Sequence, residues 1–256
     1  MLCSVGVTEQ EASKRPSERA PLPRRVAAEL LGSALLAAVV VGSGIAAQTL
    51  SPGQIGLELF ENAAATAAGL FAIILMVGPV SGGHLNPVVS LVDAAFGGIA
   101  WRDVAVYIPA QIIGCIAGAI TANAMFGLAA VSISQHDRTS GGHWLAEIIA
   151  TFGLLLLIFA LTRSGRTQFT PAAVGAYIGA GYFFTSSTSF ANPAITIGRM
   201  FSDSFAGVAP LSVPGFVAAQ LIGGVIAFAV IVTMYPDVRA RAADVVVPAR
   251  ELPATK

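Results

Sequence analysis

The chain carries His84-Leu85-Asn86-Pro87-Val88 and, later, Phe190-Ala191-Asn192-Pro193-Ala194, both within apolar surroundings. Asn is a favoured helix N-cap, and Pro fits the first helical position because its missing N–H would have no partner there. Each stretch therefore predicts the start of a helix. If both helices begin inside a membrane, two positive dipole ends and two carboxamides face a common point. Such a point is polar without net charge, as a pore for neutral solutes requires.

The composition is that of a membrane protein. Of 256 residues, 55% are hydrophobic and 11% are charged, and the mean hydropathy is +0.76. Apolar stretches near the roughly 20 residues that span a bilayer recur along the chain. We predict spans at about 26–47, 61–80, 104–127, 144–162, 171–189 and 212–235.

The two segments that follow the Asn-Pro pairs, about 86–97 and 192–202, are too short to cross a bilayer. They are predicted to be re-entrant half-helices, which a membrane tolerates only where they are buried in protein or line an aqueous cavity.

The basic residues predict the orientation. With an even number of spans, 12 of the 14 Lys and Arg residues fall on one side, and only Arg138 and Arg199 fall on the other. The positive-inside rule then places both termini in the cytoplasm. The expected location is the inner cell membrane, which the chain crosses several times. We expect a disordered cytoplasmic arm (1–25), a channel domain (26–235) and a cytoplasmic tail (236–256), with no cleavable signal peptide.

Other partners have no support in the sequence. The net charge is zero, which gives no argument for nucleic acid. Cys3 lies in the arm and Cys115 within a span, so neither a disulfide nor a metal is indicated, and no cofactor is expected.

Three landmarks recur in the same order, which indicates an internal repeat. Besides the Asn-Pro pairs, Ala28-Glu29-Leu30-Leu31 is echoed by Ala146-Glu147-Ile148-Ile149, and Ala110-Gln111-Ile112-Ile113-Gly114 by Ala219-Gln220-Leu221-Ile222-Gly223. The halves, about 26–127 and 143–235, each hold three spans, so the second half must be inverted relative to the first. Inverted repeats place a site at the midplane between the halves. The pairs Gly114/Gly118 and Gly175/Gly179 are typical of close helix crossings.

With these motifs, the chain resembles the major intrinsic protein family, the aquaporins and aquaglyceroporins. Ser81-Gly82-Gly83-His84-Leu85-Asn86-Pro87-Val88 is close to the first family signature, and a second Asn-Pro-Ala follows one inverted repeat later. The resemblance covers about residues 26–235. It implies an all-α membrane fold: a right-handed bundle of six transmembrane helices with two half-helices meeting at the centre, assembled in membrane lipid as a homotetramer with one pore per subunit.

The resemblance also implies site residues. Asn86 and Asn192 would lie at the pore midplane, and the half-helices would start at Pro87, Val88, Pro193 and Ala194. Glu29 and Glu147 would accept hydrogen bonds from the half-helix loops, a structural role that we favour over proton transfer. His84 is expected to be a packed, hydrogen-bonded residue that supports the first loop.

The chain departs from the family pattern in two places. The first triplet ends in Val88 rather than Ala, and Ile195 stands where water and glycerol channels have an Arg directly after the second Asn-Pro-Ala. Counting from the two Asn residues assigns the selectivity filter to Thr66, Ala180, Ser189 and Ile195. These residues are small or uncharged, so a wide filter is expected. The pattern resembles bacterial members of the family associated with arsenic detoxification.

Arg199 lies on nearly the same helical face as Asn192 and about 10 Å further along, at 1.5 Å per residue. It either overhangs the outer vestibule or pairs with Asp203, and we favour the pairing. No Asp, Glu or Lys is expected near either Asn-Pro motif on the deep side, so the lumen should lack other ionisable groups.

The predicted function is a passive channel for small neutral solutes, such as glycerol-like polyols, urea, arsenous acid or methylated arsenicals and some water, with protons and ions excluded. A water-selective aquaporin is the alternative. An ion-coupled transporter would need Glu29 or Glu147 as its coupling carboxylate, and a non-conducting scaffold is also open. An enzyme is not expected, since no nucleophile–base pair or metal cluster is apparent.

Overall fold

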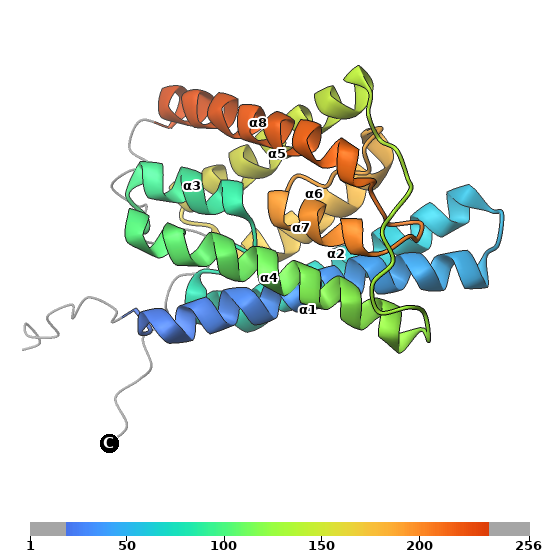
Figure 1. Ribbon diagram of the computed structural model, residues 1–256. Helices are drawn as coiled ribbons and strands as arrows, with labels where there is room; N and C mark the ends of the chain where they lie inside the picture. The colour runs from blue at the N-terminus through green and yellow to red at the C-terminus, as the bar shows by residue number, and fades with distance from the viewer. Residues whose placement is uncertain (1–18, 236–256) are drawn as a thin grey trace, which may run out of the picture.

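The computed structural model describes residues 19–235, and every regular element within them is helical, so the expected all-α fold class is confirmed (Figure 1). Residues 1–18 of the expected disordered arm (1–25) and the expected tail, 236–256, lie outside the described residues. The α-helices are α1 Leu22–Leu50, α2 Ile55–Ser81, α3 Pro87–Phe96, α4 Trp101–Met125, α5 Gly141–Arg163, α6 Thr170–Phe184, α7 Pro193–Gly198 and α8 Val213–Met234.

In the described part of the chain, five helices are long and apolar enough to cross a membrane: α1, α2, α4, α5 and α8 with the short turn before it. The predicted fifth span corresponds to α6, which has 15 residues and is preceded by a 3-10 turn, Thr167–Phe169. α1 begins at Leu22, four residues earlier than expected, because Pro21 and Pro23 suit a helix start. The chain is therefore an integral multi-pass membrane protein.

The two halves repeat the same packing. α1 packs against α4 and α2, and in the second half α5 packs against α8 and α6. Equivalent glycines permit these crossings: a Cβ on Gly114 of α4 would lie 3.0 Å from Ser33 Cβ of α1, and one on Gly223 of α8 would lie 2.6 Å from the Ile148 carbonyl oxygen of α5. Small residues let helix backbones approach closely, as the sequence predicts.

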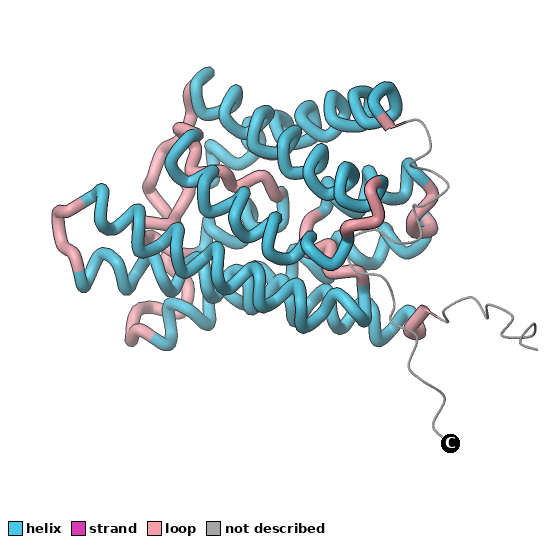
Figure 2. The backbone as a smooth tube through the Cα atoms, turned by 180° about the vertical axis from the view of Figure 1, so that it is seen from behind, coloured by secondary structure: helices cyan, strands magenta, loops and turns pink. Residues whose placement is uncertain are grey.

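The two half-helices α3 and α7 lie inside the bundle, each in contact with α4 and α8. Loop segments accordingly lie within the bundle as well as at its ends (Figure 2). α7 is shorter than predicted: it ends at Gly198 and continues as a 3-10 turn, Arg199–Phe201. The starts of both half-helices thus come together near the centre of the molecule.

Candidate functional site

Two asparagines join the half-helices across the centre of the molecule. The Oδ1 of Asn86 accepts from Val88 N at 2.9 Å, and that of Asn192 accepts from Ala194 N at 2.9 Å, so each Asn caps its own helix. Each Nδ2 also donates at 2.7 Å to the loop of the other half, Asn86 to Ala191 O and Asn192 to Leu85 O. One N–H of each carboxamide remains for the cavity that both residues line.

The loops before the two caps adopt the same unusual backbone. Gly82, Gly83 and Leu85 have φ of 92°, 64° and 52°, and the equivalent Thr188, Ser189 and Ala191 have 62°, 51° and 50°. The left-handed region costs residues other than glycine on the order of 1 kcal/mol or more each. The second loop, which has no glycine at these positions, needs the stronger external support.

Two buried glutamates hold these loops. Glu29 accepts from Ser81 Oγ, His84 N, Leu85 N and Gln111 Nε2 at 2.6–3.0 Å. Glu147 accepts from Ser187 Oγ, Phe190 N, Ala191 N and Gln220 Nε2 at 2.6–2.9 Å. Both side chains are fully buried. The acceptors thus satisfy backbone N–H groups that the left-handed turns leave without helical partners.

A further pair of equivalent bonds was not foreseen from the sequence. Gln111 Nε2 donates to Ser90 Oγ at 3.1 Å, and Gln220 Nε2 donates to Thr196 Oγ1 at 2.9 Å. Each hydroxyl in turn donates to the carbonyl oxygen of the cap asparagine four residues earlier. The sequence pattern that could have predicted these bonds is the repeated Ala-Gln segment together with the hydroxyl residue that follows each Asn by four positions.

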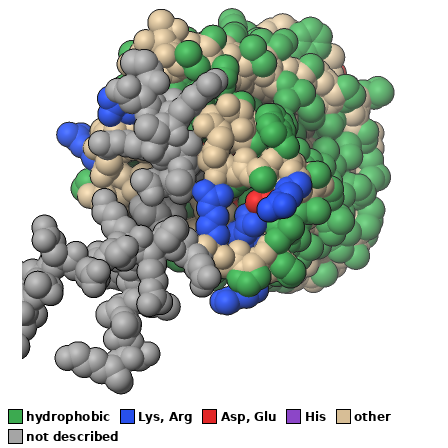
Figure 3. Space-filling model, turned by 90° about the vertical axis from the view of Figure 1, so that its left-hand side faces the viewer, with side chains coloured by type: hydrophobic (Ala, Val, Ile, Leu, Met, Phe, Trp, Pro, Cys, Tyr) green, Lys and Arg blue, Asp and Glu red, His purple; other side chains and the backbone are tan. Residues whose placement is uncertain are grey.

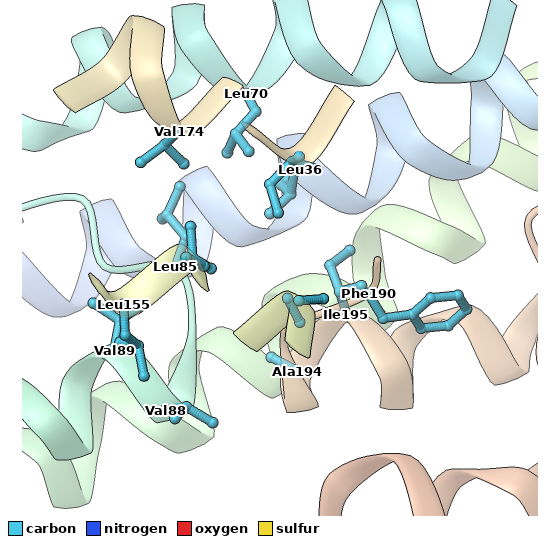
Figure 4. Close-up of a cluster of buried hydrophobic side chains, with 14 of the residues drawn as sticks. Leu36, Leu70, Leu85, Val88, Val89, Leu155, Val174, Phe190, Ala194 and Ile195 are labelled. Carbon is cyan, nitrogen blue, oxygen red and sulfur yellow. The ribbon is translucent and has the colours of Figure 1, made fainter. Parts of the chain in front are cut away.

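An apolar cavity runs beside the asparagine pair. Leu36, Leu70 and Val174 come from α1, α2 and α6 and lie across from Leu85 and Ile195 of the half-helix segments (Figure 4). Polar atoms enter this wall only from the asparagines, the loop backbone and a few side chains. A neutral solute with hydroxyl or amide groups finds hydrogen-bond partners along one edge and hydrocarbon on the other.

Three of the four predicted filter residues line the cavity: Thr66, Ser189 and Ile195, all nearly fully buried. The assignment of Ala180 is wrong, because that residue is exposed on the outside of α6 and does not line the cavity. Tyr182, which the sequence reasoning missed, takes its place, and its OH lies 3.1 Å from Thr66 Oγ1. Two residues along a helix correspond to about 200° of rotation, so the shift exchanges the outer face for the inner face.

One end of the cavity carries a buried imidazole–carboxylate pair. His84 lines the cavity, its Nε2 lies 3.4 Å from Asp93 Oδ2, and its Nδ1 lies 3.0 Å from Ser90 Oγ. The expectation that the lumen lacks other ionisable groups is therefore corrected: His84 lines the cavity, and Asp93, seven residues after Asn86, contacts His84 without lining the cavity itself.

Arg199 occupies the other end of the cavity. The favoured pairing with Asp203 is wrong: Arg199 is 2% exposed, lines the cavity, donates from Nε to Ala206 O and places Cζ 3.4 Å from the centroid of the Phe190 ring. Asp203 instead accepts from Gln135 N at 2.9 Å. The 3-10 turn at the end of α7 directs the two side chains apart.

A second arginine lies close to the same ring but outside the cavity lining. Arg138, in the loop after α4, donates to Gly207 O at 3.1 Å and Phe205 O at 3.3 Å, and its Cζ lies 5.4 Å from the Phe190 centroid. Burial lowers the pKa of this guanidinium. Among residues 19–235, no three His, Cys, Asp or Glu side chains lie close enough together to hold a metal ion.

Comparisons with known proteins agree with this fold. The family model of the major intrinsic protein matches residues 17–191. The chain is 47% identical to aquaglyceroporin AqpS of Rhizobium meliloti over 208 residues, covering 81% of this chain and 88% of that protein. It is 34% identical to Aquaporin-10 of Milnesium tardigradum over 211 residues, covering 71% and 51%. The X-ray structure of the aquaglyceroporin from Plasmodium falciparum superposes with a TM-score of 0.66 at 22% identity, over 86% of this chain and 100% of that one.

Proposed function

Since the chain belongs to the major intrinsic protein family, whose members are channels and not enzymes, we propose that it is a passive channel for uncharged solutes of the size of glycerol, urea and arsenous acid or its methylated forms. Water also passes, and protons and metal cations are excluded. The observation that carries the proposal is the cavity lined by Asn86 and Asn192, where two helix N-termini meet without a carboxylate between them. The relative named an aquaglyceroporin supports solutes larger than water.

Each site residue has a role in this proposal. Asn86 and Asn192 offer an N–H to the passing solute, while Pro87, Val88, Pro193 and Ala194 start the half-helices that aim their dipoles at it. Thr66, Tyr182, Ser189 and Ile195 form the constriction. Because Tyr182 replaces the small Ala180 there, the constriction is narrower than the sequence suggests, and the Thr66–Tyr182 pair adds a polar edge.

The orientation and assembly are also proposals. Lys and Arg side chains gather on the end of the molecule where the described chain begins (Figure 3). The positive-inside rule places this end in the cytoplasm and Arg199 at the outer end. A homotetramer in the lipid of the inner cell membrane would cover the exposed apolar side chains of the long helices, such as Leu75, Ile113 and Val225.

Stopped-flow light scattering on proteoliposomes tests the proposal. The wild-type protein should accelerate the entry of glycerol and urea above that of empty liposomes, with a low activation energy. Protein carrying Asn86→Asp and Asn192→Asp at equal density is the control for leak around the channel. If water passes but glycerol and urea do not, the proposed class of solutes is wrong and the protein is a water-selective channel. Flux of none of them would overturn the channel itself.

A further inference from the structure

The two half-helices carry ionisable residues at equivalent positions. Asp93 follows Asn86 by seven residues, and Arg199 follows Asn192 by seven. Each side chain folds back onto the residue that lies two before its asparagine: Asp93 onto His84 at 3.4 Å, and Arg199 onto Phe190 at 3.4 Å. The inverted repeat therefore places His84, paired with Asp93, at one end of the cavity and Arg199 at the other.

Arg199 reaches the constriction although its Cα lies beyond it. It follows Ile195 by four residues, which is one helical turn, on the same face and about 6 Å further along. Side chains on a helix lean toward its N-terminus, and the contact with Phe190 shows that Arg199 does so. The guanidinium thus returns toward the level of Ser189 and Ile195, with which it shares the cavity lining.

The guanidinium keeps most of its donors free. Nε donates to Ala206 O, but the two Nη groups, with four N–H bonds, donate to no group of the described chain. No Asp or Glu among residues 19–235 forms an ion pair with Arg199, although the side chain is 2% exposed. Proteins rarely bury an arginine without a carboxylate partner. Here the guanidinium that carries the unused donors belongs to the lining of the cavity.

We propose that Arg199 is the specificity-determining residue of this channel: it supplies, from one turn further along the second half-helix, the fixed positive charge and the forked donor that Ile195 lacks. The inference rests on the proposed channel function. Its charge repels cations and hydrated protons at the constriction. Its fork binds two oxygen atoms of one solute, so it favours molecules with adjacent hydroxyl groups, such as glycerol, over amides such as urea.

Three variants in proteoliposomes test this role, with Arg138→Met as the matched control. Arg138 contacts the same ring and donates to the carbonyl groups of Gly207 and Phe205, which flank the Ala206 carbonyl group that Arg199 binds, but it stays outside the cavity lining. Arg199→Met should raise the voltage-driven proton leak by about tenfold or more and reduce the glycerol-to-urea flux ratio. Arg138→Met should leave both at wild-type values. Adding Ile195→Arg to Arg199→Met should restore proton exclusion, which a merely structural role of Arg199 would not allow.

If Arg199→Met does not assemble, Arg199→Lys tests the same role. Lysine keeps the positive charge and loses the forked donor, so this variant should still exclude protons while its glycerol-to-urea flux ratio falls. Two results would overturn this inference and leave the proposed function standing. In the first, Arg199→Met conducts glycerol and its proton leak equals that of the wild type. In the second, Arg199→Lys leaks no more protons than empty liposomes and its glycerol-to-urea flux ratio equals that of the wild type. No glycerol flux through the wild type would overturn both.

Discussion

At the scale of single residues, the central asparagines each serve both halves of the molecule. The acceptor atom caps one half-helix, while the donor nitrogen binds the loop carbonyl of the other half. An aspartate at either position keeps the cap and loses the donor. It also places carboxylate oxygen against the carbonyl oxygen that the amide had bound, which adds repulsion to a lost hydrogen bond.

We therefore expect Asn192→Asp to lower glycerol flux per channel by about tenfold or more, the factor that corresponds to about 1.4 kcal/mol. Stopped-flow light scattering at equal protein density measures it. The matched control is Asn123→Asp: Asn123 is equally buried and donates to Ala130 O and Phe201 O, away from the lumen. That variant should lose stability but keep its flux per folded channel. Unchanged flux in Asn192→Asp would remove Asn192 from the solute path.

Glu147 sits among donors only, so a glutamine there must turn its own NH2 toward other N–H or O–H groups. We expect Glu147→Gln to lower the free energy of unfolding by about 1–3 kcal/mol, because at least one buried donor loses its acceptor. Thermal unfolding in detergent measures the change. Glu58→Gln is the control: Glu58 accepts one bond, from Gly53 N at 2.9 Å, which the glutamine oxygen can keep. Equal stability of the two variants would contradict the role of Glu147 in holding the second half-helix loop.

The same glutamates bear on the transporter alternative. A coupling carboxylate must bind and release an ion during each cycle, but Glu29 and Glu147 are each occupied by four donors and do not line the cavity. The geometry therefore gives neither residue a path to a transported ion.

At the scale of elements, the half-helices could be predicted well at their starts and poorly beyond them. Asn followed by Pro specifies a cap and a first turn from local chemistry alone, and the structure begins both helices there. The ends depend on tertiary contacts. The 3-10 turn Arg199–Phe201 separates Arg199, which still lies one helical turn after Ile195, from Asp203, whereas an ideal helix would have placed Arg199 and Asp203 one turn apart on one face.

The choice between Ala180 and Tyr182 has a similar cause. Counting backward from Asn192 passes through the loop 185–191, whose path the sequence does not specify. Val174, Ile178 and Tyr182 recur at four-residue spacing along the inner face of α6, but the outer face is apolar as well because it faces lipid. In a membrane helix that is apolar all round, hydrophobic periodicity does not tell the lumen from the lipid.

Close packing of α7 against α4 gives a prediction for an element. A Cβ on Gly198 would lie 2.7 Å from Cys115 O and 2.8 Å from Cys115 Cβ, both rigid parts of α4. Gly198→Ala should therefore push the half-helix outward and cost about 1–3 kcal/mol of stability. Gly56→Ala, in the exposed first turn of α2 with open space around it, should be neutral or stabilising by up to about 1 kcal/mol. Thermal unfolding compares them, and equal melting temperatures would contradict the tight contact.

At the scale of the whole molecule, the inverted repeat uses one set of bonds twice. Three sets of hydrogen bonds occur in both halves: those that the buried glutamates accept from the loops, those from glutamine to hydroxyl groups, and those that each central asparagine donates to the loop of the other half. The repeat was visible in the sequence because these bonds need the same residue types at the same spacing. The residues that break the symmetry, Asp93 with His84 and Arg199 with Phe190, were the ones whose surroundings could not be predicted.

The charge distribution of the whole molecule makes the last prediction. Six of the eight Lys and Arg residues in the described chain flank the start of α1, the start of α4 or the end of α5: Arg19, Arg24, Arg25, Arg102, Arg163 and Arg166. Lys and Arg side chains gather at the end where α1 begins (Figure 3). The positive-inside rule places that end in the cytoplasm. Cys115 is fully buried, so replacing Cys3, which lies outside the described residues, with Ser leaves a chain without an accessible thiol among its described residues.

Two single cysteines in that background read out the orientation. Leu211→Cys lies at the Arg199 end, where Leu211 is 90% exposed, and Arg166→Cys lies at the opposite, basic end. A membrane-impermeant maleimide should label Leu211→Cys in intact spheroplasts and Arg166→Cys only after permeabilisation. Because moving the arginine-rich ends of α1, α4 and α5 across the membrane would require translocating several charges, a mixture of orientations is not expected. Labelling of Arg166→Cys in intact spheroplasts would reverse the orientation and place Arg199, with its free donors, at the cytoplasmic mouth.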